Sequence, residues 1–237
     1  MFLNADIGEG HDDRALLRYV DAVNIACGGH TGDHSSISTA LRQVQAVIDA
    51  GHACNVGAHP SYPDRAGFGR TNQSLGDDEL HSTLVEQLAL FADVARQYNT
   101  SVTHIKAHGA LYHRIANDHG TAALFARCCA DVFPGAAIIS LAGSETLGTL
   151  ASLGATVHRE AFADRRYTHD GQLVSRSTGN AVFENSELAA QQAKQLLTGD
   201  SITSVDGSSI AIEADTLCVH GDSPIALQLV KRIAQLR

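Results

Sequence analysis

The sequence predicts an α/β fold, a seven-stranded parallel β/α barrel with a small β excursion near residues 164–212. Short apolar runs alternate with amphipathic helical patterns along the chain, and no linker or low-complexity segment interrupts them. Strands that alternate with helices favour parallel pairing through right-handed crossovers. Repetition without an obvious reversal favours a closed barrel, and an open doubly wound sheet is the alternative.

Seven apolar runs have the length and composition of buried strands. They cover Phe2–Ile7, Ala22–Cys27, Ala53–Ala58, Val102–Ala107, Ala136–Leu141, Thr156–Ala161 and Thr216–Val219. The repetition continues from one end of the chain to the other, so we expect residues 1–237 to form one β/α-barrel domain.

A helical pattern is expected after each strand. The clearest begins after Asp33, a residue type that caps helices, places Ile37, Leu41 and Val44 on one face, and ends at Gly51. Further helices are expected after Asp12 or Asp13, over 77–98, 109–112, 121–132, before Gly154, over 184–197, and from Pro224 in a first helical turn. The turn dipeptides Asp170-Gly171 and Asp206-Gly207 predict the β excursion.

Composition excludes several classes of protein. The net charge is −9 and no block of basic residues occurs, which argues against a nucleic-acid or anionic-membrane partner. The five cysteines lack CxxC spacing and lie in apolar patterns, so we expect buried reduced thiols. With neither a signal peptide nor a run long enough to span a membrane, we expect a cytoplasmic protein.

Polar residues follow six of the seven predicted strands, and the fifth is followed only by Gly143 and Ser144. In a β/α barrel these positions meet at one mouth, where the chemistry of such barrels takes place. We therefore expect a shared site. Its candidates are Asp6, Glu9, Asn24, His30, His59, Asp64, Lys106, His108, Glu160, Asp164, Arg165, His220 and Asp222.

The residue types suggest two kinds of site. Asp6 or Glu9 with His30 and His59 would form a carboxylate-plus-two-histidine set for a divalent metal, although no HExxH-type spacing occurs. The alternative is a proton-relay site without a metal. Lys106 lies on the same side of its strand as the residue two positions later, His108, and would bind an anion or act as a base.

The basic residues and the search for nucleotide-binding motifs give weaker evidence about the site than the strand-end residues do. Arg65, Arg70 and Arg165 could bind a carboxylate or phosphate through two hydrogen bonds each. Neither GxxxxGK[ST] nor GxGxxG occurs, so the chain carries no standard phosphate-binding loop. His104 alternates with Lys106 and could share its face, although a structural role is the simpler expectation.

Several motifs together resemble the LamB/YcsF family, in the same order and from residue 3 to about 224. They are LNADIGEG (3–10), NIACGGHTGD (24–33), GAHPSYPDRAGFGR (57–70), HIKAHGALY (104–112), FADRRY (162–167), DGQLVSRS (170–177) and CVHGDSP (218–224). The resemblance implies a seven-stranded barrel similar to the glycoside hydrolase/deacetylase folds. It also implies the ATP-dependent opening of 5-oxoproline to L-glutamate in a complex with 5-oxoprolinase subunits B and C.

The resemblance also implies a set of functional residues, all present here. Catalytic roles are expected for Asp6, Glu9, Lys106, His108 and His220. Substrate-binding roles are expected for Asn24, Asp64, Arg70, Tyr112, Asp164, Arg165 and Asp222. Metal ligation is expected for His30 and His59.

Four positions depart from the family pattern. Gly29 stands where the family usually has Phe, and Ala107 where it usually has Pro. Arg166 and Ser175 replace the usual Gly and Pro. We expect Gly29 to remove a wall of the substrate pocket and Ala107 to free the backbone beside Lys106.

A lactam is a poor electrophile because its nitrogen donates electrons into the carbonyl, so ring opening needs activation by ATP. We expect Asp6 or Glu9, with His30 or His59, to activate water directly or through a metal. Lys106, His108 and His220 would stabilise the developing oxyanion or phosphate, and an arginine or Lys106 would hold the substrate carboxylate. Two alternatives are a stand-alone metal-dependent amidohydrolase or deacetylase, and a non-catalytic substrate-binding subunit.

Overall fold

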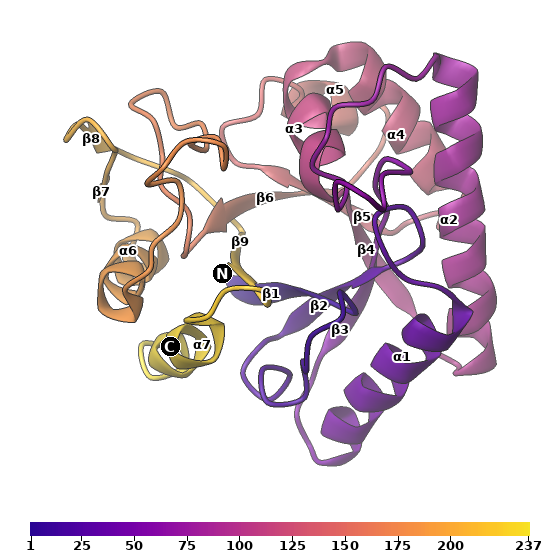
Figure 1. The fold of residues 1–237 in the computed structure, drawn as a ribbon, viewed down its shortest axis with the longest axis horizontal. Helices are drawn as coiled ribbons and strands as arrows, with labels where there is room; N and C mark the ends of the chain where they lie inside the picture. Colours follow the sequence, from indigo (N-terminus) through magenta and orange to yellow (C-terminus); the bar gives the residue numbers. More distant parts are fainter.

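A computed structural model describes residues 1–237 and contains a closed barrel of seven parallel strands in the order β1-β2-β3-β4-β5-β6-β9 (Figure 1). The barrel strands are β1 Phe2–Ile7, β2 Ala22–Ala26, β3 Asn55–His59, β4 Val102–Lys106, β5 Ala137–Leu141, β6 Val157–Phe162 and β9 Thr216–His220. The β/α-barrel prediction is confirmed. The open-sheet alternative is excluded because β9 pairs with both β6 and β1, which closes the ring of strands and leaves no free edge.

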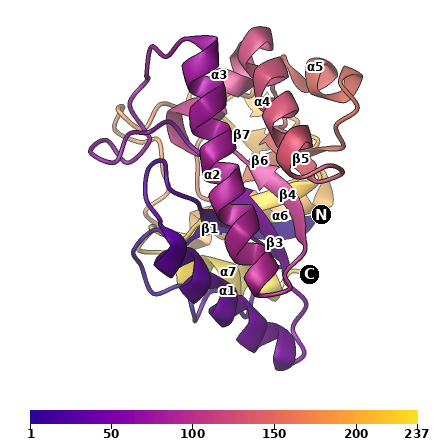
Figure 2. The same ribbon diagram turned by 90° about the vertical axis from the view of Figure 1, so that its right-hand side faces the viewer.

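Seven helices accompany the barrel. Their bounds are α1 His34–Asp49, α2 Asp77–Gln97, α3 Gly109–Asn117, α4 His119–Val132, α5 Leu147–Ser152, α6 Ser186–Thr198 and α7 Ala226–Ala234. Figure 2 shows α2 and α4 side by side outside β3, β4 and β5. Helices α6 and α7 pack together on the opposite side of the barrel (Figure 1). No helix is long and apolar enough to cross a membrane.

The helix after the second strand begins as the sequence indicates. The Asp33 carboxylate accepts a hydrogen bond from the Ser36 backbone N–H at 2.8 Å, and the Ser36 hydroxyl lies 2.8 Å from the Asp33 backbone N–H. This reciprocal cap satisfies amides that a helix N-terminus otherwise leaves without partners. The apolar face of α1 then buries Ile37, Leu41 and Val44.

Two helix predictions are wrong. Residues 14–19 form turns, so β1 is not followed by a helix. The Asp13 carbonyl oxygen accepts hydrogen bonds from the backbone N–H groups of Leu16 and Leu17, but an extended series of helical hydrogen bonds does not follow. The Asp13 carboxylate instead accepts a hydrogen bond from the Gly8 backbone N–H at 2.9 Å. Pro224 lies in a turn ahead of α7, which begins at Ala226, rather than within its first turn.

The predicted β excursion is present between β6 and β9. Strands β7 Ile202–Thr203 and β8 Ser209–Ile210 form a two-stranded antiparallel sheet after α6. Isolated antiparallel bridges join Arg165 to Val182 and Tyr167 to Leu173. This excursion brings Leu173, Ser175, Arg176 and Ser177 to the barrel mouth, where they line the cavity described below.

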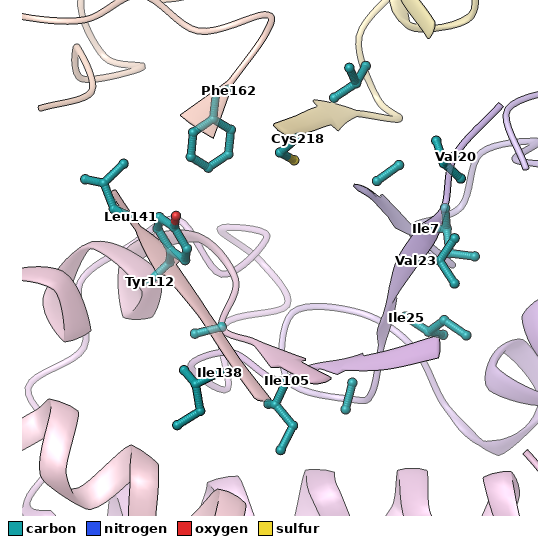
Figure 3. Close-up of a cluster of buried hydrophobic side chains, with 14 of the residues drawn as sticks. Ile7, Val20, Val23, Ile25, Ile105, Tyr112, Ile138, Leu141, Phe162 and Cys218 are labelled. Atoms are coloured by element: carbon teal, nitrogen blue, oxygen red, sulfur yellow. The ribbon is translucent and has the colours of Figure 1, made fainter. Parts of the chain in front are cut away.

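Apolar and polar side chains separate across the barrel wall because successive strand residues point to opposite faces. Ile7, Val23, Ile25, Ile105 and Ile138 point outward toward the helices in Figure 3. Phe162 and Cys218 point inward in the same view. Most of the hydrophobic core therefore lies between the strands and the helices, and the barrel interior holds polar groups together with Phe162 and Cys218.

Candidate functional site

A cavity of about 710 Å³ opens at the carboxyl ends of the barrel strands. Eight of the residues predicted from the sequence line it. They are Asp6, His59, Arg70, Lys106, His108, Tyr112, Arg165 and His220. The structure thus gathers side chains from β1, β3, β4, β6 and β9 at one mouth, where β/α barrels carry their active sites.

Lys106 lies at the floor of this cavity, with its side chain almost fully buried. Its ammonium nitrogen is 3.0 Å from Asp6 Oδ1, 3.0 Å from Glu160 Oε1 and 3.1 Å from Cys218 Sγ. Burial alone would lower the pKa of Lys106. The negative charges around it, of which Asp6 has the largest effect, outweigh burial and hold the pKa well above its usual value. Lys106 is therefore a fixed buried cation, not a neutral base.

A layer of hydrogen-bonded polar side chains fills the barrel below Lys106. Asn4 donates to Glu160 Oε1 at 2.9 Å and to the Thr216 hydroxyl at 2.8 Å. Asn24 donates to Asn4 at 2.8 Å and to Asp6 Oδ1 at 2.8 Å, and the His104 ring lies 2.9 Å from Asn24 Oδ1. These groups fix the direction in which Asp6 and Lys106 face the cavity.

Room for the His104 ring depends on Gly57, its partner in the β3–β4 register. A Cβ at Gly57 would lie 2.3 Å from the imidazole. His104 therefore occupies the interior space that a side chain on β3 would otherwise take. Burial lowers the pKa of His104 to about 3, so the ring is neutral.

A second polar cluster joins the first four strand ends and consists of Glu9, His30, His59 and His108. Glu9 Oε1 lies 2.8 Å from His30 Nε2, 3.2 Å from His108 Nδ1 and 3.9 Å from His59 Nε2. The rings of His30 and His108 stack with centroids 3.7 Å apart. The two predicted metal ligands are thus adjacent, and the structure adds His108 to them.

Electrostatics within this cluster follow from burial and from its carboxylates. Burial lowers the pKa of His30 to about 4 and also lowers that of His108, which favours neutral rings. His59 lies 3.3 Å from Asp6, which outweighs burial and raises its pKa. Burial would raise the pKa of Asp6, but His59 and Lys106 hold it well below 3.8.

His220 forms another part of the mouth with Asp164. The His220 ring lies 3.0 Å from the Asp164 carboxylate and stacks on Phe162 with centroids 5.3 Å apart. Burial would raise the pKa of Asp164, but His220 outweighs it and keeps the carboxyl ionised. Asp164 itself does not line the cavity, so it acts on the mouth through His220.

Basic side chains occupy the rim. Arg70 pairs with Asp222 at 2.7 Å, whereas Arg165 is buried and donates to the Val174 carbonyl at 2.6 Å. Burial, with Arg176 nearby, lowers the pKa of Arg165 to about 10. Cations gathered at one opening of an acidic chain provide a local attraction for an anionic ligand.

The remaining predicted residues lie behind the cavity surface. The Asp64 carboxylate accepts hydrogen bonds from the Gly67 and Thr71 amides at 2.8 and 3.1 Å, which fixes the loop that carries Arg70. Asn24, Glu9 and His30 contact residues that line the cavity, while Asp222 holds Arg70. In contrast, Tyr112 is one of the eight predicted residues that line the cavity, and it donates to Glu160 Oε2 behind the surface at 2.8 Å.

Three further residues belong to the site: Glu160, which the sequence places at a strand end without a role, and Asn4 and Cys218, which are not among the candidates predicted from the sequence. All three contact the buried charges. The two-residue alternation of side chains along a strand is the signal that points to Asn4 and Cys218. Asn4 and Cys218 each lie two residues before a predicted site residue, Asp6 and His220, and so share its strand face. The expectation of buried reduced cysteines is confirmed.

Gly29 does not open the pocket as expected, and it is not among the residues that line the cavity. A Cβ at Gly29 would lie 2.3 Å from Ser61 Oγ and 2.5 Å from Gln87 Oε1. The space of the missing side chain is therefore filled by Ser61 and Gln87. Ala107 does line the cavity.

Fold and site together define a β/α-barrel enzyme with buried imidazoles, carboxylates and a lysine at its mouth. A family model described as the LamB/YcsF family matches residues 1–236. The chain belongs to the LamB/YcsF family, which confirms the resemblance of its motifs.

Similar proteins cover nearly the whole chain. The chain is 41% identical to the A subunit of 5-oxoprolinase from Halalkalibacterium halodurans, over 99% of this chain and 92% of that protein. It is 40% identical to a 5-oxoprolinase A subunit of Pseudomonas syringae pv. tomato, with the same coverage. The crystal structure of the lactam utilization protein from Thermus thermophilus superimposes with a TM-score of 0.90 and 31% identity, over 100% of this chain and 95% of that one.

Proposed function

We propose that this chain is the A subunit of an ATP-hydrolysing 5-oxoprolinase and that 5-oxoproline is opened to L-glutamate in the barrel mouth. The observation that carries the proposal is the similarity to 5-oxoprolinase A subunits over 99% of the chain. The site supports it, because a buried cation, Lys106, and the ionised carboxylate of Asp6 face one cavity beneath a basic rim.

The rim would hold the substrate carboxylate. Arg165 and Arg70 are the cationic candidates, and Asp222 and Asp64 position Arg70 directly and through its loop. Arginine binds a carboxylate through two parallel hydrogen bonds, which would fix the ring with its amide toward the cavity floor. Tyr112 and Asn24 would act through Glu160 and Asp6, which they hold by hydrogen bonds.

The floor would carry out the hydrolysis. Transfer of a phosphoryl group from ATP to the lactam oxygen, which we assign to the complex with subunits B and C, makes the ring carbon electrophilic. A first water adds to that carbon, the carbon–nitrogen bond breaks as the nitrogen takes a proton, and a second water releases phosphate. Asp6, kept ionised by His59 and Lys106, would orient the attacking water by accepting a hydrogen bond from it, and the proton that the water loses would pass to solvent in the cavity.

Lys106 and His220 would stabilise the negative charge that develops on oxygen. Lys106 suits this role because its charge is fixed by Asp6 and Glu160, and His220 because Asp164 orients its ring. Glu9 and His108 would hold His59 in position from the other side.

The experiment is an ATP-dependent assay of glutamate formation from 5-oxoproline with the purified chain and subunits B and C. Lys106→Met should lower turnover by about 100-fold or more, in line with the loss of an oxyanion-stabilising group. Lys194→Met, on the exposed face of α6, is the matched control and should leave turnover unchanged. Equal turnover for both variants would refute a catalytic floor at Lys106 and favour a substrate-binding subunit.

A stand-alone metal-dependent amidohydrolase is the second candidate, and the cluster of Glu9 with three histidines favours it. It predicts lactam or amide hydrolysis by the isolated chain without ATP, abolished by a chelator. The assay above separates the two functions when subunits B and C and ATP are omitted in turn.

A further inference from the structure

The cavity carries more positive charge than 5-oxoproline can balance. Asp6 is the single carboxylate in its lining, and the cationic side chains there are Arg70, Lys106, Arg165 and Arg176. Arg70 and Lys106 are already paired with carboxylates of the chain. Neither Arg165 nor Arg176 forms an ion pair, and the neighbouring Asp164 is held by His220. Because 5-oxoproline brings one negative charge, one unpaired cation is left over at the mouth.

Arg176 lies at the tip of a loop formed by residues 174–181, which belongs to the orange segment between β6 and α6 in Figure 1. Both ends of this loop are bonded to one residue. The Arg166 carbonyl oxygen accepts a hydrogen bond from the Val174 amide at 3.0 Å, and the Arg166 amide donates to the Ala181 carbonyl oxygen at 2.9 Å. The loop is therefore anchored at both ends, and its tip reaches the cavity.

The Arg165 side chain fastens the same loop from within the protein. Its guanidinium group donates to the Val174 carbonyl oxygen at 2.6 Å, and its Nε–H donates to the Ala181 carbonyl oxygen at 3.4 Å. Arg165 is therefore a positioning residue for the loop. Arg176 differs, because its side chain is exposed and makes no hydrogen bond within the chain. All of its N–H groups are available to a ligand.

Two imidazole rings face the cavity near Arg176. They belong to His113 on α3 and His220 at the end of β9. Desolvation inside the concave mouth lowers the pKa of His113 to about 4, and the charges of Arg165, Arg176 and His220 act in the same direction. The His113 ring is therefore neutral and close to both arginines. It adds an N–H donor to this part of the cavity without adding charge.

Arg176 and Arg70 reach the mouth from opposite sides of the barrel. Arg70 belongs to the loop after β3, and Arg176 belongs to the excursion after β6. In the ring of strands, β3 and β6 are separated by β4 and β5 on one side and by β9, β1 and β2 on the other. A ligand between the two arginines can therefore place one anionic group on each, with Lys106 beneath it.

The donors around Arg176 suit a phosphoryl group. Near neutral pH such a group carries about 1.5–2 negative charges and three oxygens that accept hydrogen bonds. Arginine binds it through two parallel hydrogen bonds, and a neutral imidazole can donate another. A carboxylate needs less charge than this, and Arg70 already provides for one on the other side of the mouth.

We propose that Arg176 and His113 form a phosphoryl subsite, and that the ligand bound in this cavity is the lactam already phosphorylated on its oxygen. The carboxylate of that ligand lies on Arg70, its phosphoryl group on Arg176, and its ring carbon above Lys106. The identity of the lactam rests on the proposed function. The terminal phosphate of ATP shares the phosphoryl chemistry, and a separate titration with ATP distinguishes the two sources.

The test titrates the isolated full chain with inorganic phosphate, 5-oxoproline and ATP in separate calorimetric runs. We expect the parent to bind phosphate, and Arg176→Gln to bind it about 10-fold or more weakly, in line with the loss of a hydrogen bond to a charged group. The affinity for 5-oxoproline should not change, because Arg70 holds its carboxylate, and ATP should bind no more tightly than phosphate. Arg127→Gln, at an exposed position on α4, is the matched control and should bind all three compounds as the parent does.

Three results would overturn the proposal. The first is absence of phosphate binding by the parent, or equal phosphate affinity in the parent and in folded Arg176→Gln, with folding checked by circular dichroism. The second is a loss of 5-oxoproline affinity in Arg176→Gln, which would assign Arg176 to the substrate carboxylate. The third is tight ATP binding that Arg176→Gln abolishes, which would identify the nucleotide as the source of the phosphoryl group.

A kinetic readout in the complex with subunits B and C separates phosphoryl binding from carboxylate binding. Arg176→Gln should lower kcat for glutamate formation by about 10-fold or more and leave the KM for 5-oxoproline unchanged. Arg176→Lys should restore part of kcat, because it keeps the charge. A raised KM with unchanged kcat would contradict the subsite. The calorimetric titrations need neither turnover nor partner subunits, so the phosphoryl subsite and the proposed function fail separately.

Discussion

The buried pair of Lys106 and Glu160 permits a quantitative prediction for stability. Lys106→Met removes the cation and leaves two buried carboxylates, Asp6 and Glu160, facing each other without it. Glu160→Gln removes one charge but keeps polar atoms that can bond to Asn4 and Tyr112. The double variant removes both partners of the pair and keeps Asp6.

The magnitude follows from the 3.0 Å separation of Lys106 Nζ and Glu160 Oε1. Two unit charges at that distance attract by about 5.5 kcal/mol at an effective dielectric constant of about 20. Removing one partner of a buried pair typically costs about 3–5 kcal/mol, because the other charge stays desolvated. We expect about 4 kcal/mol for Lys106→Met and about 2 kcal/mol for Glu160→Gln, where Lys106 keeps Asp6.

The assay is urea unfolding of the isolated chain followed by circular dichroism, for the parent, both single variants and the double variant. Because the two residues contact each other, the double variant should lose about 2 kcal/mol less unfolding free energy than the two single variants lose in total. A matched cycle with Lys194→Met and Glu160→Gln should show no coupling. Additive losses in the Lys106 cycle would refute the view that these charges stabilise each other.

Three further predictions rest on other contacts. Gly57→Ala places a Cβ 2.3 Å from the His104 ring and should destabilise the fold by about 3 kcal/mol in urea unfolding, whereas Gly148→Ala meets open space and should be neutral or better. Burial raises the pKa of Asp13 from 3.8 to about 6 despite a backbone hydrogen bond, so the stability that its protonated carboxyl contributes is full below pH 3.8 and is lost as the pH rises through 6. Asp13→Asn should therefore exceed the parent by about 3 kcal/mol at pH 8 and match it near pH 3 in parallel denaturant titrations; a gap that does not change with pH would contradict this assignment. Asp33→Ala removes the α1 cap and should cost about 1 kcal/mol in thermal unfolding, with Asp93→Ala on an exposed helix surface as the control.

Several parts of the fold follow from local sequence alone. The seven strands and the Asp33 cap were predictable because apolar runs and capping residues act over a few neighbouring positions. The missing helix after β1 was not, because a carboxylate that looks like a cap instead bonds backward to the Gly8 amide. Apolar spacing cannot reveal from which backbone N–H a carboxylate will accept a hydrogen bond.

Sequence also placed most of the site, since polar residues after parallel strands must meet at one mouth. Asp6, His59, Lys106, His108 and His220 all line the cavity, as expected from that rule. Local pattern could not decide which groups pair, because pairing depends on barrel closure and register between strands that are far apart in the chain.

Residues in the barrel interior show this limit most clearly. Lys106 meets Glu160 across the barrel, and Gly57 admits the His104 ring only because β3 and β4 set them opposite each other. Gly29 is the same kind of case, since its space is taken by Gln87 from a helix much later in the chain. The order of strands and polar residues along the chain is enough to place these residue types at the mouth. Their partners depend on how the barrel closes, because burial and the distances between remote segments set the charge and tautomer of each group.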